Sequence, residues 1–305
     1  MALIVQKFGG TSVGTVERIQ QVAAKVKKFR ENGDDIVVVV SAMSGETNRL
    51  IDLAKQVSDG QPVPRELDVM VSTGEQVTIA LLAMALIKIG VPAVSYTGNQ
   101  VRILTDSAHN KARILQIDDQ KLRADLKAGR VVVVAGFQGV DEHGNITTLG
   151  RGGSDTTGVA LAAALKADEC QIYTDVDGVY TTDPRIVSRA RKLKAVTYEE
   201  MLELAASGAK VLNIRATEYA RRHGVTLHVR SSFVPNEGTI VYNPTEGETV
   251  EEPIITGVAG DLSQAKITVI GVPDVPGKAA EIFKIVAKSG ANVDMIVQNV
   301  SAAST

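Results

Sequence analysis

The 305-residue chain contains one cysteine, four histidines and no tryptophan. Because Cys170 has no second cysteine to pair with, no internal disulfide can form, which is typical of proteins from a reducing compartment. The histidines are scattered without the spacing of a zinc site. Aromatic residues make up only 4% of the sequence, which argues against a surface on which nucleic acid bases stack. A cytoplasmic location is therefore expected.

The sequence also lacks an excess of positive charge and a long apolar run. Lysine and arginine number 33 against 35 aspartate and glutamate, so nothing points to a nucleic acid partner. No segment approaches the roughly 20 apolar residues that span a bilayer, and the N-terminal apolar run is too short for a signal peptide. We expect a soluble enzyme, with no membrane partner, that forms one large core or two domains.

Apolar runs rich in β-branched residues alternate with helical segments over most of the chain. The valine runs at 36–40 and 131–134 do not alternate with polar residues, which indicates strands buried on both faces. The pattern predicts an α/β protein, a three-layer αβα sandwich with a largely parallel central sheet. The expected strands are 36–40, 91–96, 131–135, 169–173 and 226–229. The expected helices are 46–57, 67–89, 118–127, 158–166 and 198–223, the last broken near Gly208.

A change of composition near residue 243 suggests a domain boundary. Residues 1–242 would form the catalytic domain, and the acidic, turn-rich segment 243–253 would be a linker. Residues 254–305 then read as a small β-α-β unit, with strands at 266–272 and 292–297 around a helix at 276–289.

The segment 148–157 carries the strongest chemical signal. Arg151 precedes the glycine pair Gly152 and Gly153, and Ser154 and Asp155 open an alanine-rich helix. An arginine fork, free glycine amides and a helix N-terminus together favour an anion-binding site. A tight turn before an ordinary helix would explain the glycines, but it would not explain the arginine.

A second glycine turn lies near the N-terminus. A short apolar strand is followed by Lys7, Gly9 and Gly10 and then by a segment of helical periodicity, a layout that can hold phosphates. Neither the Walker pattern nor Gly-x-Gly-x-x-Gly occurs. A plain strand-to-helix turn is the alternative.

Other polar residues lie where predicted strands end or helices begin. Ser41 follows a buried strand, where open α/β sheets bind ligands, and Thr47 opens the next helix. Glu75 falls inside a long apolar helix, so it needs an ammonium ligand or a structural ion pair as its partner. Lys210, after Gly208 at a predicted helix start, is poorly placed beside the helix dipole unless it binds a phosphate.

The segment 173–185 runs from a strand into a loop rich in turn residues. Tyr180 and Arg185 could hold a nucleotide there, whereas an exposed acidic loop is the simpler interpretation.

Taken together, these motifs resemble the aspartate kinases of the amino-acid-kinase family. Six segments occur in that family's order within residues 1–242: 7–12, 40–43, 72–75, 136–139, 149–157 and 173–185. The later unit, with residues 272–277, resembles the opening half of an ACT regulatory domain. Because the family carries two ACT domains, the chain looks truncated within the first.

The resemblance implies an amino-acid-kinase fold and ATP-dependent phosphorylation of the L-aspartate β-carboxylate, the first step towards lysine, threonine and methionine. It implies Mg²⁺ with the nucleotide, a homo-oligomer (a dimer or larger), and feedback by lysine, threonine or both in a full-length form. Weak or absent inhibition is expected for this chain.

The resemblance also assigns roles to residues of this sequence, without naming a metal ligand. Lys7 and Asp155 would be catalytic, with Asp155 organising the lysine. The residues implied to hold the nucleotide are Lys7, Phe8, Gly9, Gly10, Thr174, Asp175, Tyr180, Arg185 and Lys210. Those implied to line the aspartate site are Ser41, Thr47, Glu75, Arg151, Gly152, Gly153 and Ser154.

Two alternatives stay open. Acetylglutamate, glutamate 5- and uridylate kinases share this type of fold, although Glu75 favours a substrate with a free amino group. The second alternative is a non-catalytic regulatory subunit that binds an amino acid. The joint presence of Lys7, Arg151, Asp155 and Lys210 argues against this alternative.

Overall fold

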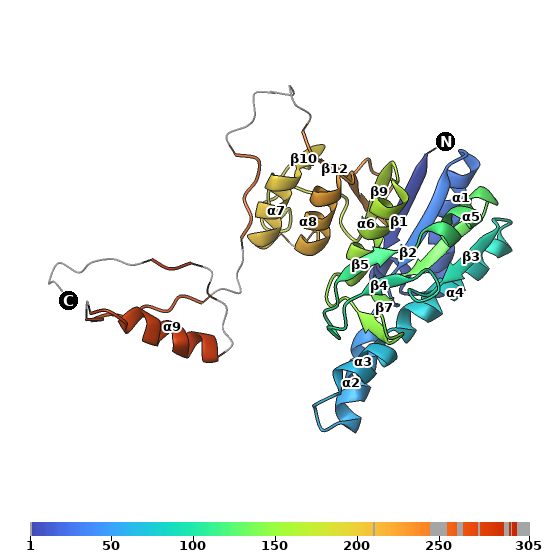
Figure 1. The fold of residues 1–305 in the computed structure, drawn as a ribbon. Helices are drawn as coiled ribbons and strands as arrows, with labels where there is room; N and C mark the ends of the chain where they lie inside the picture. The colour runs from blue at the N-terminus through green and yellow to red at the C-terminus, as the bar shows by residue number, and fades with distance from the viewer. Residues whose placement is uncertain are drawn as a thin grey trace. The chain divides into compact units, whose positions relative to one another are not determined.

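A computed structural model describes residues 2–209, 211–244, 255–260, 265–273, 275–289, 293 and 295–297. The chain divides into two compact units, Met1–Asp261 and Leu262–Thr305 (Figure 1). The domain boundary inferred from the composition stays a prediction.

The first unit is built on an eight-stranded sheet in the order β10-β12-β11-β9-β1-β2-β6-β3. Every neighbouring pair is parallel except β11 with β12, which confirms the largely parallel sheet. The strands are β1 (Leu3–Phe8), β2 (Asp35–Val40), β3 (Ala93–Tyr96), β6 (Val131–Ala135), β9 (Glu169–Thr174), β10 (Ala195–Thr197), β11 (Leu227–Ser231) and β12 (Thr239–Tyr242).

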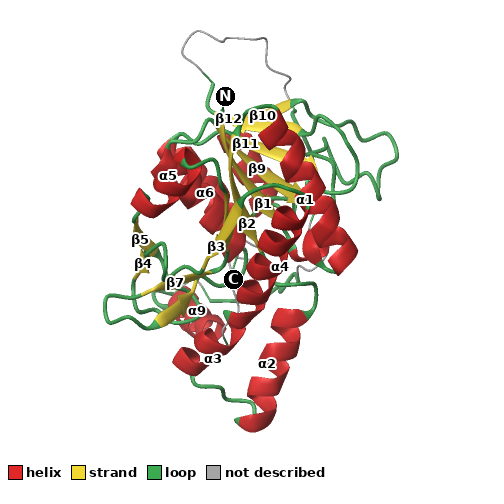
Figure 2. Cartoon of the chain, turned by 90° about the vertical axis from the view of Figure 1, so that its right-hand side faces the viewer, coloured by secondary structure: helices red, strands yellow, loops and turns green. Residues whose placement is uncertain are grey.

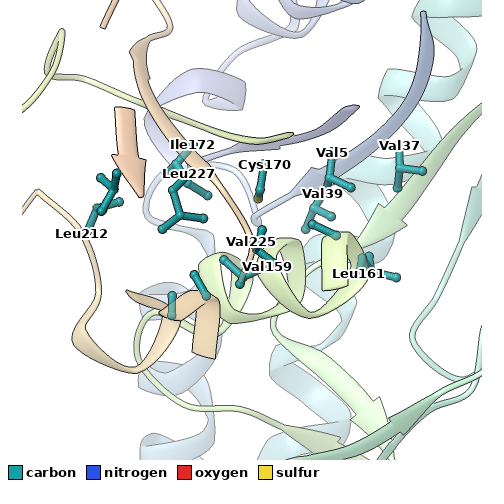
Figure 3. Close-up of a cluster of buried hydrophobic side chains, with 14 of the residues drawn as sticks. Val5, Val37, Val39, Val159, Leu161, Cys170, Ile172, Leu212, Val225 and Leu227 are labelled. Carbon is teal, nitrogen blue, oxygen red and sulfur yellow. The ribbon is translucent and has the colours of Figure 1, made fainter. Parts of the chain in front are cut away.

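The central strands are buried on both faces, as the valine runs predict. In β2, Val37 and Val39 belong to one hydrophobic cluster, shown in Figure 3, while Ile36 and Val38 belong to the cluster on the opposite face. This division follows from the two-residue period of a strand.

Helices cover both faces and complete the three layers. Figure 2 shows α5 and α6 on one side of the sheet and α1 and α4 on the other. The helices of this unit are α1 (Val16–Glu31), α2 (Glu46–Val57), α3 (Pro64–Val71), α4 (Thr73–Lys88), α5 (Gln120–Lys127), α6 (Gly153–Leu165), α7 (Tyr198–Ala206) and α8 (Ile214–His223), with a 3-10 turn, η1, at Gly10–Val13.

A second sheet of four short strands, in the order β5-β4-β7-β8, lies outside the strands expected from the sequence. The turn-forming residues at 141–145 connect two antiparallel strands that lead back to the Arg151 segment. The strands of this second sheet are β4 (Ile103–Thr105), β5 (Ile114–Ile117), β7 (Gln138–Val140) and β8 (Ile146–Thr148).

The single helix predicted at 67–89 is wrong, because the segment forms α3 and α4 with a break at Ser72. The hydroxyls of Ser72 and Thr73 donate to the carbonyls of Val69 and Met70, and such bonds compete with the helical backbone pattern. The helix predicted to begin at 158 begins instead at Gly153, so the glycine pair forms the helix start itself.

The expectation that no segment is long and apolar enough to span a bilayer is also wrong. The helical stretch Pro64–Lys88 reaches a mean hydropathy of 1.6 over 18 residues, but half of that window is buried inside the protein. Ile79, Leu82 and Leu86 belong to the core against β2 and β6. We therefore interpret the segment as core helix of the α/β unit.

The second unit contains α9 (Lys278–Lys288), which confirms the helix predicted at 276–289. The strand predicted at 266–272 does not form, since residues 265–273 are described without a strand. Of the strand predicted at 292–297, the described residues 293 and 295–297 form none, and Asn292 and Asp294 lie outside the described residues. A strand needs a paired edge, and the described part of this unit provides none.

Candidate active site

Most of the residues predicted for the site gather at one edge of the central sheet. Strands β9, β1, β2 and β6 are adjacent and parallel, so their carboxyl ends open onto the same cavity, of about 450 Å³. Eleven of the residues predicted from the sequence line it: Lys7, Gly10, Ser41, Thr47, Glu75, Arg151, Gly152, Gly153, Ser154, Asp155 and Asp175.

Lys7 and Asp155 form an ion pair at the base of this site. Lys7 Nζ lies 2.5 Å from Asp155 Oδ1, and the two side chains are 10% and 17% exposed. Since Asp155 Oδ1 makes no directed hydrogen bond within the described residues, the attraction is mainly that of charges. A Cβ on Gly158 would lie 3.2 Å from Lys7 Cβ, so this glycine lets α6 approach β1 closely. The carboxylate thereby holds the ammonium at the cavity.

Arg151 lies in a turn built on two glycines of positive φ, Gly150 at 77° and Gly152 at 73°. Any side chain on Gly152 would overlap Asn213. Among the described residues no side chain caps the start of α6, and the N-terminus of that helix is open for an anion. The anion-binding interpretation therefore fits this geometry better than that of an ordinary capped helix.

Glu75 is a carboxylate in an apolar setting, only 2% exposed. Its Oε1 accepts a hydrogen bond of 3.0 Å from the Ala42 N–H, while Oε2 has no partner among the described residues. Burial raises the pKa of Glu75 to about 7, and the Ala42 N–H opposes this only in part. Among the described residues Glu75 has no cationic side chain as a partner, so the structural ion pair is not found there. A cationic ligand would satisfy the free oxygen.

The N-terminal glycine turn docks against the loop after β2. A Cβ on Gly10 would lie 2.9 Å from the carbonyl oxygen of Ala42, so only glycine fits there without a shift. The Gly9 N–H donates a long bond of 3.4 Å to the Tyr173 carbonyl. Phe8 is fully buried and stacks on Tyr173 with ring centroids 4.5 Å apart, so it offers the site its backbone alone.

Comparison with known proteins identifies the family of this chain. The model of the "Amino acid kinase family" matches residues 2–231. The chain belongs to the amino acid kinase family. It is 73% identical over 301 residues to "Aspartate kinase" from Pseudomonas putida, covering 99% of this chain and 73% of that protein.

Solved structures of this family share the fold. The aspartate kinase from Synechocystis is 47% identical, with a TM-score of 0.73, covering all of this chain and 51% of that one. Aspartokinase III from E. coli, in complex with lysine and aspartate, is 28% identical, with a TM-score of 0.82, covering 97% of this chain and 77% of that one.

The residues expected to hold the nucleotide of an amino acid kinase are only partly brought together. Asp175 lines the cavity and accepts a bond of 3.0 Å from Thr174 Oγ1. The Tyr180 hydroxyl donates to Asp177 Oδ1 at 2.9 Å, and Arg185, whose side chain is 88% exposed, pairs with Asp183 at 2.7 Å; neither lines the cavity. Lys210 lies outside the described residues, and the helix predicted to begin near it begins at Ile214.

Seven further residues line the cavity that were not among the predicted site residues: Thr11, Ala42, Met43, Ser44, Gly45, Phe137 and Gly150. Phe137 has a φ of 69°, rare outside glycine. Its N–H donates to Thr157 Oγ1 at 3.1 Å, and its carbonyl accepts from the Leu149 N–H at 2.9 Å. Its place directly after Gly136, which follows a buried strand, was the available signal.

The described residues contain no group of three or more histidine, cysteine, aspartate or glutamate side chains that could hold a metal ion. Three carboxylates line the cavity: Asp155 is engaged with Lys7, Glu75 is buried, and Asp175 is exposed. A divalent cation would therefore take most of its ligands from nucleotide phosphates and water, as Mg²⁺ commonly does.

Proposed function

We propose that this protein transfers the γ-phosphoryl group of ATP to the β-carboxylate of L-aspartate, forming 4-phospho-L-aspartate and ADP. The observation that carries the proposal is one cavity that joins the Lys7–Asp155 pair, the Arg151 turn and a buried glutamate with a free oxygen. The similarity to the aspartate kinase of Pseudomonas putida supports the same substrate.

The chemistry suits these residues. An aspartate side chain, with a pKa near 3.9, is already ionised at neutral pH and needs no general base. A β-carboxylate oxygen attacks the γ-phosphorus, and the bond from that phosphorus to the bridging oxygen breaks to release ADP. Because two anions must meet, catalysis depends on positioning and charge neutralisation. Lys7, the Gly10 backbone and the α6 N-terminus would supply these, and Mg²⁺ bound with ATP would neutralise further phosphate charge.

Glu75 and Arg151 would select an α-amino acid. The planar fork of Arg151 suits an α-carboxylate, and the free oxygen of Glu75 suits an α-ammonium. Acetylglutamate has an acylated amine and would leave Glu75 unpaired, and a uridylate acceptor offers no ammonium. The ion pair of Lys7 with Asp155 argues against a non-catalytic subunit.

Aspartate binding should depend on the ionisation of Glu75. Burial raises the pKa of Glu75 to about 7, so its carboxyl group is mostly neutral below pH 7 and mostly charged above it. We expect kcat/KM for aspartate to fall as the pH drops through about 7, because the neutral acid cannot pair with an ammonium. Glu75→Gln should lower kcat/KM for aspartate by roughly 10- to 100-fold and abolish the fall of kcat/KM at acidic pH, which is the acidic limb of the pH profile.

The matched control is Glu66→Gln, since the Glu66 side chain on α3 is 64% exposed and pairs only with Arg65 among the described residues. It should keep the wild-type profile. If the acidic limb persists in Glu75→Gln, the titrating group is another one.

We further propose that the protein is a cytoplasmic homo-oligomer and that residues 254–305 belong to an ACT-type unit of the kind that binds lysine or threonine. The resemblance of residues 272–277 supports this, as does the lysine in the complex of E. coli aspartokinase III.

Regulation of the 305-residue chain itself should be weak. Helix α9 buries none of its residues, so the described part of this unit forms no packed pocket for an effector. We expect sub-millimolar lysine or threonine to change the rate little in a steady-state assay. Strong inhibition by either amino acid would show that an effector site is complete in this chain.

The proposed function is tested by trapping the product. With ATP, Mg²⁺ and aspartate, hydroxylamine should convert the acyl phosphate into aspartate β-hydroxamate, identified by mass spectrometry. ATP turnover without any hydroxamate would exclude a carboxylate as the acceptor.

A further inference from the structure

The turn that carries Arg151 rests on a second loop, residues 106–112. The Ala112 N–H donates to the Thr148 carbonyl at 2.9 Å. A Cβ on Gly150 would lie 2.8 Å from the carbonyl oxygen of Asn110, so the two segments touch directly before Arg151. Because its glycines have wide conformational freedom, the turn needs external contacts to hold the arginine in place.

Asp68 of α3 supplies one set of these contacts and is fully buried. Its carboxylate accepts hydrogen bonds from His109 Nδ1 at 2.7 Å, from the Asn110 N–H at 3.1 Å and from the Thr148 hydroxyl. One buried side chain thus joins α3, the 106–112 loop and the end of β8. Charge-assisted bonds in a buried setting are the strong kind.

Arg215 of α8 supplies the other set. Its Nη1 donates to the Leu149 carbonyl and its Nη2 to the Ala112 carbonyl, both at 2.7 Å. The guanidinium therefore ties the same two segments together. Since Asn213, at the start of the same helix, packs beneath Gly152, α8 supports the turn on both sides of Arg151.

We propose that Asp68 and Arg215 are positioning residues that hold the Arg151 turn in its substrate-binding geometry and so set the affinity for the amino acid. Neither residue lines the cavity, so both act through the turn. The inference rests on the proposed function in that it takes the amino acid as the ligand of Arg151. A bidentate grip on a carboxylate tolerates little displacement, which makes the KM for the amino acid the sensitive quantity.

The test is steady-state kinetics of Asp68→Asn and Arg215→Gln. Each should raise the KM for aspartate about 10- to 100-fold, the range seen when a supporting contact of a site is lost. The KM for ATP and kcat at saturating aspartate should stay within roughly twofold, because the Lys7–Asp155 pair is untouched. Glu66→Gln on α3 and Arg222→Gln on α8 are the matched controls, since both residues are exposed, and they should behave as wild type.

If the two residues only stabilise the fold, the variants should contain a smaller fraction of active enzyme, which lowers the apparent kcat and leaves both KM values unchanged. That result overturns the proposal. If Asp68→Asn does not fold, Thr148→Val removes only one donor to Asp68 and should still raise the KM for aspartate; an unchanged KM there also overturns it. If the wild type prefers another amino acid, the proposed function fails, and the positioning role is then measured on the KM for that substrate.

Discussion

Replacing Lys7 by alanine is expected to lower kcat by about 100- to 1,000-fold with only a modest change in the KM for aspartate, comparable to removing one preorganised charge from a transition state. Lys7 is nearly buried beside Asp155, so its charge acts in a setting that water screens weakly. Charge on the transferring group develops during the reaction, and the loss should therefore fall on kcat. Steady-state kinetics with both substrates measure it.

The control for this variant is Lys27→Ala on α1, where the lysine side chain is 40% exposed and lies outside the cavity lining. Lys27 forms a loose ion pair of 3.8 Å with Glu31 and donates a hydrogen bond of 3.1 Å to the Ile89 carbonyl. The control variant should retain wild-type kinetics. The double variant Lys7→Ala with Asp155→Asn should be less impaired than the two losses combined, because Lys7→Ala alone leaves an uncompensated carboxylate near the phosphates. A loss confined to the KM for aspartate would place Lys7 in the amino acid site.

Arg151→Lys is expected to raise the KM for aspartate strongly, with less effect on kcat. A lysine keeps the charge but cannot reproduce two parallel hydrogen bonds to a carboxylate. The loss is on the order of 2–4 kcal/mol, or about 30- to 900-fold in kcat/KM. The Gly150 and Gly152 turn should still form, since neither glycine is altered. Kinetics at varied aspartate concentration check the prediction.

Arg222→Lys on α8 is the matched control, because that arginine is exposed and lies outside the cavity lining. If Arg151→Lys leaves the KM for aspartate unchanged, Arg151 has no place in the substrate site.

Local sequence patterns predicted the layered fold well, because they reflect burial. The valine runs of β2 and β6 could only be strands covered on both faces, and the structure divides Val37 and Val38 between the two hydrophobic clusters. Since parallel strands end at one edge, the same reasoning placed Lys7 and Ser41 together at the cavity.

Features that depend on distant contacts could not be predicted in the same way. Asp68 reads as one more polar residue of a helix, and its three donors come from residues 41 to 80 positions away. The break at Ser72 depends on which carbonyls its hydroxyl reaches, and the strained backbone of Phe137 depends on the bonds it makes with Leu149 and Thr157. Such contacts are set by tertiary packing, which no local pattern records.

The central claim, that L-aspartate is the phosphoryl acceptor, is tested most directly by one coupled assay of ADP release. ATP and Mg²⁺ are held constant while aspartate, glutamate and acetylglutamate are compared at equal concentrations. Aspartate should give the highest kcat/KM. The free oxygen of Glu75 and the Arg151 fork fit an α-amino acid and disfavour acetylglutamate, and the similarity to the aspartate kinase of Pseudomonas putida favours aspartate over glutamate. Faster turnover of glutamate or acetylglutamate would contradict the account.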